Sequence, residues 1–506
     1  MLVEIKSPQI DAANKSPDTK LHPLPLRKNS LTTMITATIT ATVPEDNVYT
    51  TLVRTFPKRF VTFKPRTSHL DRETMDASKN PLRGFFVLFW LAMAVYVVQT
   101  IVHNLESLGR IVDLSFFELF SRDAIVLALS DACMVGATFF DVILQKMIAR
   151  GWIEWRYTGM AIQHLYQVTF LFSAAYWTYY RGWPWVQSGF FVLHTIAMLM
   201  KIHSYAYYNG DMSAFAHRLR VLRKEYSQLL GETKKAEDGD EEKEKNRQQR
   251  LSRLRAWIEE IENITKSASG NASYPDNLTF ANFLDYLLVP TLVYELEYPR
   301  TEKIRPRYVF EKALATLGTF FLLYMNTETY IIPVLPNSTT SFWRALLQMS
   351  IPFMVNYLLI FYIIFECICN VFAELTRFAD RHFYDDWWNS TTFEEFARKW
   401  NRPVHHFLLR HVYQSSIDSY KLSRRDASLM TFLLSSLIHE LVMVVVSKKI
   451  RMYLFALQMF QLPLIWVGNL PAVKERTWLG NAFFWFGMMC GPPLLGILYC
   501  NEVFAL

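Results

Sequence analysis

The stretch that decides the fold starts at residues 383–389, which read FYDDWWN, and ends at the pair His439-Glu440. This pair lies inside residues 427–446, a mostly apolar segment of about 20 residues that is long enough to span a bilayer as a helix. An ionisable pair at membrane depth is energetically costly, so it marks a candidate functional site. The aromatic and polar FYDDWWN run at the start of the same stretch strengthens this hypothesis.

The helix predicted over residues 427–446 also carries a polar face. Thr431, Ser435 and His439 follow one another at intervals of four residues, with Ser436 beside them, so they lie on one side of the helix. We expect this side to point into a cavity or the protein interior rather than toward lipid. A single His in a membrane helix can also be a packed residue bonded to a neighbouring carbonyl, and the polar face favours catalysis over that alternative.

The distribution of apolar residues identifies the class of protein. The chain has 506 residues, of which 51% are hydrophobic, and these fall in blocks of about 20 with the charges collected between them. The pattern predicts an all-α polytopic membrane protein with about nine transmembrane helices. The expected spans are residues 85–102, 124–144, 159–180, 190–208, 309–334, 346–365, 427–446, 453–467 and 479–499.

The charge and the cysteines exclude some partners. The formal net charge of +7 is modest and spread over the loops, which indicates contact with anionic lipid headgroups or an anionic substrate and not with nucleic acid. The five cysteines lie in or beside apolar segments and have neither a disulfide framework nor zinc spacing. We therefore expect no metal site.

Outside the spans, several segments have distinct compositions. Residues 1–80 are rich in Ser, Thr, Pro and Lys and are expected to be a disordered cytosolic tail before a membrane domain at residues 81–506. Charged residues dominate a linker at about 230–252, which is expected to be flexible and cytosolic. Residues 251–264 predict an amphipathic helix that lies on the membrane or against the domain. Residues 283–294 are too short and interrupted to span, which favours a re-entrant or interfacial segment.

The loops set the expected orientation. Loops 210–308 and 366–426 are rich in Lys and Arg, which favours the cytosol for both. With an odd number of spans, the N-terminus is then cytosolic and the C-terminus lumenal, and a glycosylation sequon at Asn337 is lumenal. The basic run at residues 448–451 disagrees with this orientation, because it would also face the lumen.

Residues 383–389 fit the signature F-Y-x-D-W-W-N, with Asp385 in the free position. On this signature, and on Asn401 and His439, the chain resembles the membrane-bound O-acyltransferase (MBOAT) family from about residue 85 to its end. Residues 290–294, PTLVY, and residues 298–300, YPR, are similar to the sterol O-acyltransferase branch, particularly the fungal sterol-ester synthases. The diacylglycerol acyltransferases are close relatives that more often carry Phe at the first of these tyrosines.

The resemblance implies about nine helices that enclose an intramembrane reaction chamber, in the membrane of the endoplasmic reticulum. It implies acyl-coenzyme A as donor and an ergosterol-like sterol as acceptor, whose 3-hydroxyl is esterified to make steryl esters for storage. No resident cofactor is implied. Members of the family are commonly oligomers, so a homodimer or homotetramer is expected.

The chemistry of acyl transfer assigns roles to individual residues. A thioester and an alcohol need a base, a donor to the developing oxyanion and a site that excludes water. Imidazole suits the base role, so His439 is expected to deprotonate the alcohol as it attacks the thioester directly, without an acyl-enzyme. The resemblance shifts Asn401 toward polarising the thioester carbonyl, although residues 400–403 also have the pattern of a helix stop. Ser435 matches a family Ser and either orients the ring or thioester or packs the helix.

The remaining candidates are expected to bind substrate. Within the signature they either grip the thioester arm or fix the shape of the loop: Tyr384, Asp386, Trp387, Trp388 and Asn389. Around coenzyme A they are expected to contact the phosphates and the adenine ring, and in the case of His405 the pantetheine arm: Arg398, Tyr413, Arg424, Arg425 and His405. Each Arg by itself is also consistent with a plain interfacial charge.

Three alternatives stay open at this level. Diacylglycerol would enter from the bilayer as a sterol does, and a protein acceptor would need a lumenal entrance. A transporter would explain Asp131, Lys201, His203 and His439 within membrane segments, but the sequence has no convincing internal repeat. For Lys201, snorkelling to the interface is an alternative to a catalytic role.

Overall fold

The computed structural model describes residues 62–68, 71, 83–110, 121–233, 241–334 and 341–504, and these ranges are helical apart from connecting loops and isolated backbone bridges. In the first half, the elements are α3 (Arg83–Leu108), α5 (Ala124–Ala137), α6 (Phe140–Ala149), η1 (Trp155–Gly159), α7 (Met160–Tyr180), α8 (Trp185–Thr233), α9 (Glu241–Ile264), α10 (Phe280–Leu288), α11 (Pro306–Asn326), η2 (Thr327–Ile331) and η3 (Ile332–Val334).

In the second half, the elements are α12 (Phe342–Phe361), η4 (Tyr362–Ile368), α13 (Cys369–Leu375), η5 (Trp387–Asn389), α14 (Phe393–Trp400), α15 (Arg402–Phe407), η6 (Leu408–Gln414), α16 (Ser415–Asp418), α17 (Arg424–Ser447), α18 (Tyr453–Gly468), α19 (Pro471–Lys474) and α20 (Thr477–Phe504). Most of the expected tail at residues 1–80, residues 234–240 of the linker and Asn337 lie outside the described residues.

Among the described residues, five helical segments are long and apolar enough to cross a membrane. They are Ala124–Ala149, Trp185–Gly231, Phe342–Leu375, Arg424–Ser447 and Thr477–Cys500, and Tyr453–Gly468 is a shorter apolar helix. The prediction of an all-helical membrane protein is thereby confirmed. The remaining expected spans coincide with α3, α7 and the α11 region, which are helical, and the count of about nine stays a prediction.

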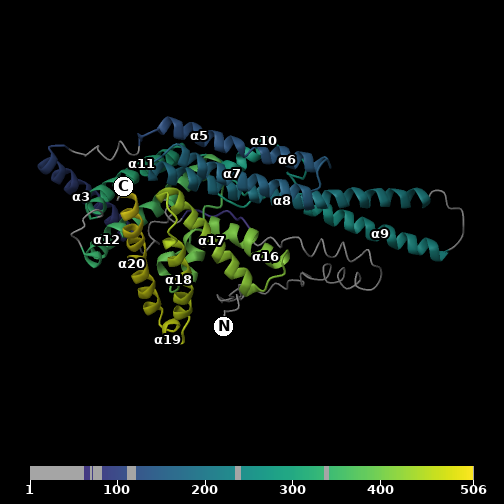
Figure 1. Cartoon of the computed structure of the whole chain (residues 1–506). Helices are drawn as coiled ribbons and strands as arrows, with labels where there is room; N and C mark the ends of the chain where they lie inside the picture. The colour runs from purple at the N-terminus through teal and green to yellow at the C-terminus, as the bar shows by residue number, and fades with distance from the viewer. Residues whose placement is uncertain are drawn as a thin grey trace, which may run out of the picture.

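The second half of α8 and the whole of α9 form an arm that projects from the body of the molecule (Figure 1). Here the structure differs from the expected flexible linker, because residues 241–252 belong to α9. Leu222 of α8 and Leu254 of α9 are buried, and Arg223 and Glu262 form an ion pair at 2.6 Å between the two helices. The amphipathic helix predicted at residues 251–264 therefore packs against α8.

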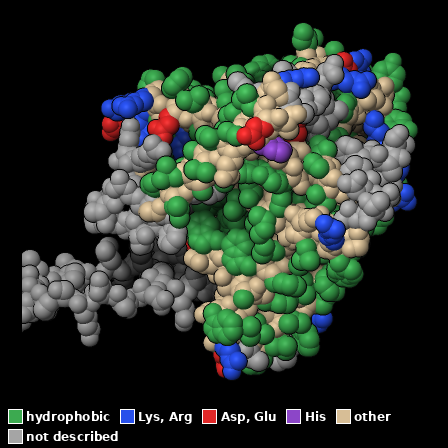
Figure 2. Space-filling view, turned by 90° about the vertical axis from the view of Figure 1, so that its left-hand side faces the viewer, with side chains coloured by type: hydrophobic (Ala, Val, Ile, Leu, Met, Phe, Trp, Pro, Cys, Tyr) green, Lys and Arg blue, Asp and Glu red, His purple; other side chains and the backbone are tan. Residues whose placement is uncertain are grey.

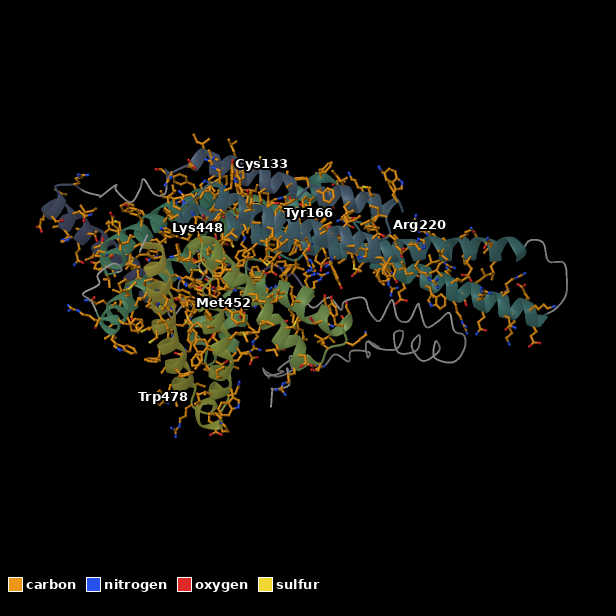
Figure 3. All side chains as sticks on the ribbon, viewed as in Figure 1. Cys133, Tyr166, Arg220, Lys448, Met452 and Trp478 are labelled. Atoms are coloured by element: carbon orange, nitrogen blue, oxygen red, sulfur yellow. The ribbon has the colours of Figure 1, made fainter. Side chains whose placement is uncertain are left out.

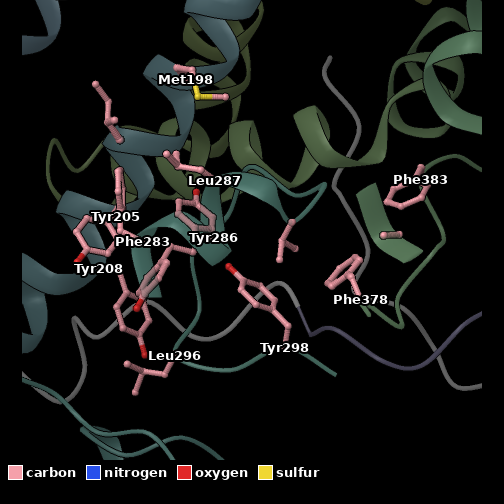
Figure 4. Close-up of a cluster of buried hydrophobic side chains, with 14 of the residues drawn as sticks. Met198, Tyr205, Tyr208, Phe283, Tyr286, Leu287, Leu296, Tyr298, Phe378 and Phe383 are labelled. Atoms are coloured by element: carbon pink, nitrogen blue, oxygen red, sulfur yellow. The ribbon is translucent and has the colours of Figure 1, made fainter. Parts of the chain in front are cut away.

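A cluster of buried aromatic side chains joins α8, α10 and the segment that follows α10 (Figure 4). Tyr205, Phe283, Tyr286 and Tyr294 are each at most 1% exposed. The ring centroids of Tyr205 and Tyr294 are 4.9 Å apart, and those of Tyr286 and Tyr294 are 5.0 Å apart. Such edge-to-face pairs are favourable beyond the area that they bury. They pack one side of residues 283–294, a segment too short to span, against α8, whereas Leu284 and Leu288 on the other side are exposed.

Lys201 holds the same segment from α8. Its Nζ donates to the carbonyl oxygens of Tyr286, Val289 and Thr291 at 2.9, 2.8 and 2.9 Å. The side chain is buried and all three ammonium protons are used, which satisfies carbonyls in the last turn of α10 and just after it. Neither snorkelling nor a catalytic role fits this geometry, so both expectations for Lys201 are wrong.

Candidate active site

His439 lies on α17, which begins where the Ser423 hydroxyl accepts the N–H of Asp426 at 3.2 Å. The His439 side chain is exposed, and its Nδ1 is 2.7 Å from the carbonyl oxygen of Ser435, one turn earlier. A carbonyl oxygen only accepts, so Nδ1 carries a ring proton and Nε2 is the nitrogen that can take up or release one. The described residues place no hydrogen-bond partner on Nε2. The geometry therefore leaves Nε2 as the ring nitrogen that is open to a substrate.

The other polar residues of this face bond to their own helix. Thr431 and Ser436 donate to the carbonyl oxygens of Ala427 and Phe432 at 2.7 and 2.9 Å. The contact that orients the His439 ring comes from the backbone of Ser435 and not from its hydroxyl. This geometry favours a packing role for the Ser435 side chain over ring orientation.

Glu440, the next residue, is buried and serves a different purpose. Its carboxylate accepts the N–H groups of Met452 and Phe455, at the start of α18, at 2.8 and 3.0 Å. It also accepts the hydroxyl of Tyr499 from α20 at 3.0 Å. The free N–H groups at a helix N-terminus stabilise a negative charge such as this carboxylate. Glu440 therefore fastens α17 to α18 and α20, near the turn marked by Lys448 and Met452 in Figure 3.

The signature at residues 383–389 forms a tightly packed loop. The Tyr384 hydroxyl donates to Glu366 Oε1 at 2.6 Å, and both residues are buried. Trp387 is 1% exposed, and its ring centroid lies 4.9 Å from that of Trp400. The carbonyl oxygen of Trp388 accepts the indole N–H of Trp485 and the amide N–H of Asn481, both from α20. For these members of the signature, the geometry favours a role in shaping the loop.

Asp386 and Asn389 are the exposed members of the signature. Asp386 forms an ion pair with Lys399 at 2.8 Å, and the Asn389 amide donates to Asp386 at 3.3 Å. Burial alone would raise the pKa of Asp386, but hydrogen bonds from Lys399 and Asn389 lower it. Asp386 is therefore a carboxylate at neutral pH, with Lys399 beside it on the open side of the loop.

Asn401 stands between α14 and α15. Its Oδ1 accepts the N–H of Val404 at 3.1 Å, so Asn401 is the N-cap of α15. The helix stop predicted at residues 400–403 is present, because α14 ends at Trp400. Capping uses only the oxygen of the amide. The described residues place no partner on its NH₂ group, which is therefore free to donate to a substrate carbonyl.

His405 follows one turn after Asn401 and is half-buried. Burial and the nearby charges of Arg398 and Arg402 lower the pKa of His405 to about 4. Its imidazole is therefore neutral at cellular pH and can contact a neutral part of a substrate without adding charge.

The expected coenzyme A residues are spread over α14, α15, η6 and α17. Arg398 is exposed on α14, 3.9 Å from Glu394, and Tyr413 is half-buried in η6. Arg424 and Arg425 are exposed in the first turn of α17. At 1.5 Å per residue, they lie about 22 Å along the helix axis from His439. Only a long substrate can reach both ends of α17.

Two carboxylates of the site were missed from sequence. Glu366 holds Tyr384, and Asp385, in the free position of the signature, pairs with His382 and Arg402. Burial would raise the pKa of Asp385, but the hydrogen bond from His382 and the charge of Arg402 hold it well below its usual range. A lone Glu in the apolar run 346–373 is a usable signal for the first of these, and the partners of Asp385 have no sequence signal.

One face of the molecule is hollowed, and hydrophobic side chains make up most of the wall of this hollow (Figure 2). The face is the one on which α3 and α12 lie in Figure 1. An apolar recess of this kind suits a lipid substrate better than a polar one.

Comparison with known proteins gives a consistent result. The family model for the membrane-bound O-acyltransferase family matches residues 149–501. A probable sterol O-acyltransferase 1 from Schizosaccharomyces pombe is 39% identical, over 86% of this chain and 85% of its own length. Sterol O-acyltransferase 2 from Candida albicans is 35% identical, over 87% and 78%. Diacylglycerol O-acyltransferase 1C from Glycine max is 35% identical over 46% of each chain.

Proposed function

The chain belongs to the membrane-bound O-acyltransferase family, and from this membership we propose that it transfers a long-chain fatty acyl group from acyl-coenzyme A to the 3-hydroxyl of a sterol. The relatives named sterol O-acyltransferases match it over most of its length, whereas the diacylglycerol relative matches less than half. The hydrophobic hollow in Figure 2 fits an acceptor that enters from the bilayer. Membership in this family also favours an enzyme over a transporter.

The observation that carries the mechanism is the proton on Nδ1 of His439, held by the Ser435 carbonyl. Nε2 takes the proton from the sterol hydroxyl while the oxygen attacks the thioester carbonyl. The tetrahedral intermediate then collapses, the carbon–sulfur bond breaks, and the proton passes from His439 to the departing thiolate. The acyl group moves in one displacement, so no covalent acyl-enzyme is formed.

The oxyanion that develops during this attack needs a donor. The NH₂ group of Asn401 supplies one, because its oxygen is fixed by the Val404 N–H and the amide cannot turn without losing that bond. The short helix α15 continues into η6, which packs against α17, so Asn401 and His439 belong to adjoining elements.

The rest of the substrate extends along the protein. The exposed Arg398, Arg424 and Arg425 bind the phosphates of coenzyme A, with Tyr413 at the adenine and His405 at the pantetheine arm. We assign the enzyme to the endoplasmic reticulum membrane, with a cytosolic N-terminus, a lumenal C-terminus and a homodimeric or homotetrameric state.

The acceptor is tested in microsomes from cells that lack their own sterol and diacylglycerol esterification. Expressed protein is given labelled oleoyl-coenzyme A with either ergosterol or diacylglycerol at matched concentrations. The proposal predicts label in steryl ester and little in triacylglycerol. Label in triacylglycerol alone would contradict the assignment of a sterol as acceptor, while the assignment as an acyltransferase would still hold.

A further inference from the structure

Residues 62–68 and Asp71, here called the N-terminal strap, precede α3 in sequence but dock around the signature loop. Phe63 packs its ring between those of Tyr298 and Phe378, with centroid distances of 5.3 and 5.9 Å. Asp71 forms an ion pair with Arg305 at 3.0 Å. Each of these partners lies more than 200 positions away in the chain, so local sequence does not account for the docking.

The backbone of the strap completes a small three-segment unit. The N–H of Ala379 donates to the carbonyl oxygen of Pro299 at 2.9 Å, which joins the segment before the signature to residues 298–300. On its other side, the N–H of Arg66 donates to the Ala379 oxygen, and the N–H of Arg381 donates to the Arg66 oxygen, both at 2.9 Å. The segment that leads into the signature thus has backbone hydrogen bonds on both sides, to residue 299 on one side and to the strap on the other.

The side chain of Arg66 starts a chain of contacts that ends next to Asn401. Its Nε and one terminal nitrogen donate to the two oxygens of Asp380, each at 2.8 Å. The other terminal nitrogen donates to Nδ1 of His382 at 2.9 Å, so the ring proton of His382 sits on Nε2. His382 Nε2 lies 2.7 Å from Asp385, which in turn accepts from Arg402. Arg402 is the first residue of α15, directly after Asn401.

Ser68 reaches the signature by a second route. Its hydroxyl lies 2.8 and 3.0 Å from the two oxygens of Glu366, the same carboxylate that accepts the Tyr384 hydroxyl. Lys312 of α11 approaches this carboxylate at 3.3 Å, so one buried anion gathers four elements of the chain. Each of these charge-assisted bonds is stronger than a neutral one.

From these contacts we propose that two side chains of the N-terminal strap, Arg66 and Ser68, are positioning residues for the acyl-transfer reaction. The inference rests on the proposed function for the reaction that it serves. Arg66 fixes the entry of the signature loop and, through His382 and Asp385, the start of α15. Ser68 fixes the carboxylate that anchors Tyr384. A displacement of the reacting groups by about 1 Å can lower a rate by about 10²-fold. Loss of either contact is therefore expected to lower the rate of acyl transfer, although neither residue touches the substrate.

The test compares strap variants with matched controls from the same segment in full-length protein. Arg66→Ala is paired with Lys64→Ala, because Lys64 is exposed and contacts Asp380 only through its backbone N–H. Ser68→Ala is paired with Thr67→Ala, because Thr67 is a neighbouring exposed hydroxyl. For each variant, kcat and KM for oleoyl-coenzyme A are measured per folded protein from total labelled lipid, together with the unfolding temperature in detergent.

Arg66→Ala and Ser68→Ala are expected to lower kcat by about 10-fold to 100-fold, with KM for oleoyl-coenzyme A within about twofold of its original value, and both controls to keep full activity. Arg66→Lys keeps the charge but loses the two-pronged bond to Asp380, so its kcat is expected to fall in between. Hydrogen exchange at the Ala379 and Arg381 amides is expected to quicken in Arg66→Ala and not in Lys64→Ala.

If Arg66→Ala and Ser68→Ala have the same kcat per folded protein as the controls, the proposal is overturned. This holds even if the unfolding temperature falls, because the two contacts would then contribute to stability alone. Unchanged exchange at residues 379–381 would also overturn it. If the unaltered enzyme makes labelled lipid other than steryl ester, the proposed acceptor fails while the strap is still tested, because total acyl transfer is the quantity compared.

Discussion

At the scale of single residues, one hydrogen bond decides what His439 is able to do. The bond from Nδ1 to the Ser435 carbonyl leaves Nε2 as the only nitrogen that can take a proton. Because the acceptor is a backbone atom one turn earlier in the same helix, the ring is oriented by α17 itself. The position therefore tolerates changes to the Ser435 side chain better than changes to the helix.

Asn401 combines a cap with an available donor, and substitutions can separate the two roles. Asn401→Ser and Asn401→Asp both keep an N-cap for α15, because Ser, Asp and Asn cap helices almost equally well. Neither supplies the NH₂ group, so we expect kcat to fall by about 100-fold or more in both. Folded yield and unfolding temperature are expected to stay within error of the original protein. Full activity in Asn401→Ser, measured with labelled oleoyl-coenzyme A, would reduce Asn401 to a cap.

Glu440 is a buried carboxylate whose partners are all donors. In Glu440→Gln, the new NH₂ group faces N–H groups that it cannot satisfy, so we expect a loss of stability of about 2 kcal/mol. Tyr499→Phe removes only the hydroxyl and should cost about 1 kcal/mol. Unfolding temperatures in detergent check both. Normal stability with lost activity in Glu440→Gln would instead point to a direct role in the chemistry of His439.

The residue scale also shows how far sequence reasoning reaches. The positions of His439 and Asn401 follow from motif resemblance and from a charged pair in an apolar helix. The contacts of Asp385, Glu366 and Arg66 do not follow, because their partners lie far away in the chain and no periodicity links them. The prediction for Lys201 fails for the same reason, since a Lys with three carbonyl partners has the same sequence pattern as one that snorkels.

At the scale of elements, close approach of helices is set by small residues. A Cβ at Gly210 of α8 would come within 2.0 Å of the Trp155 ring in η1. A Cβ at Gly231 of the same helix would meet nothing within 4 Å.

This pair gives a matched prediction. Gly210→Ala is expected to destabilise the protein by about 1–3 kcal/mol through overpacking. Gly231→Ala is expected to be neutral or to stabilise by up to about 1 kcal/mol, because Ala favours helix. Both are measured as unfolding temperatures. Equal stability of the two variants would contradict the close packing of α8 on η1.

The arm of α8 and α9 shows where element prediction fails. Its charged residues predict a flexible linker, because opposite charges alternate without a long apolar run. In the structure, Leu222, Leu254 and Ile261 supply a thin apolar seam, and ion pairs such as Arg250–Glu225 at 2.6 Å lie beside it. The seam and the ion pairs between the two helices are absent from a reading of composition alone, which therefore underestimates the order of this helix pair.

At the scale of the whole molecule, the helical membrane class and the family were predictable, because long apolar blocks and the signature at residues 383–389 are local features. The arrangement of the site was not. Residues 62–68, 283–300 and 378–389 meet only in three dimensions, and their meeting is what fixes the loop around the candidate active site.

The central claim is that His439 is the base for acyl transfer to a sterol. The most direct measurement uses microsomes free of other sterol and diacylglycerol esterification, supplied with labelled oleoyl-coenzyme A. The original protein, His439→Ala and the matched Ser435→Ala are compared at equal expression. We predict labelled steryl ester from the original and from Ser435→Ala, and a loss of at least about 100-fold in His439→Ala. Steryl ester made at the original rate by His439→Ala would contradict the account.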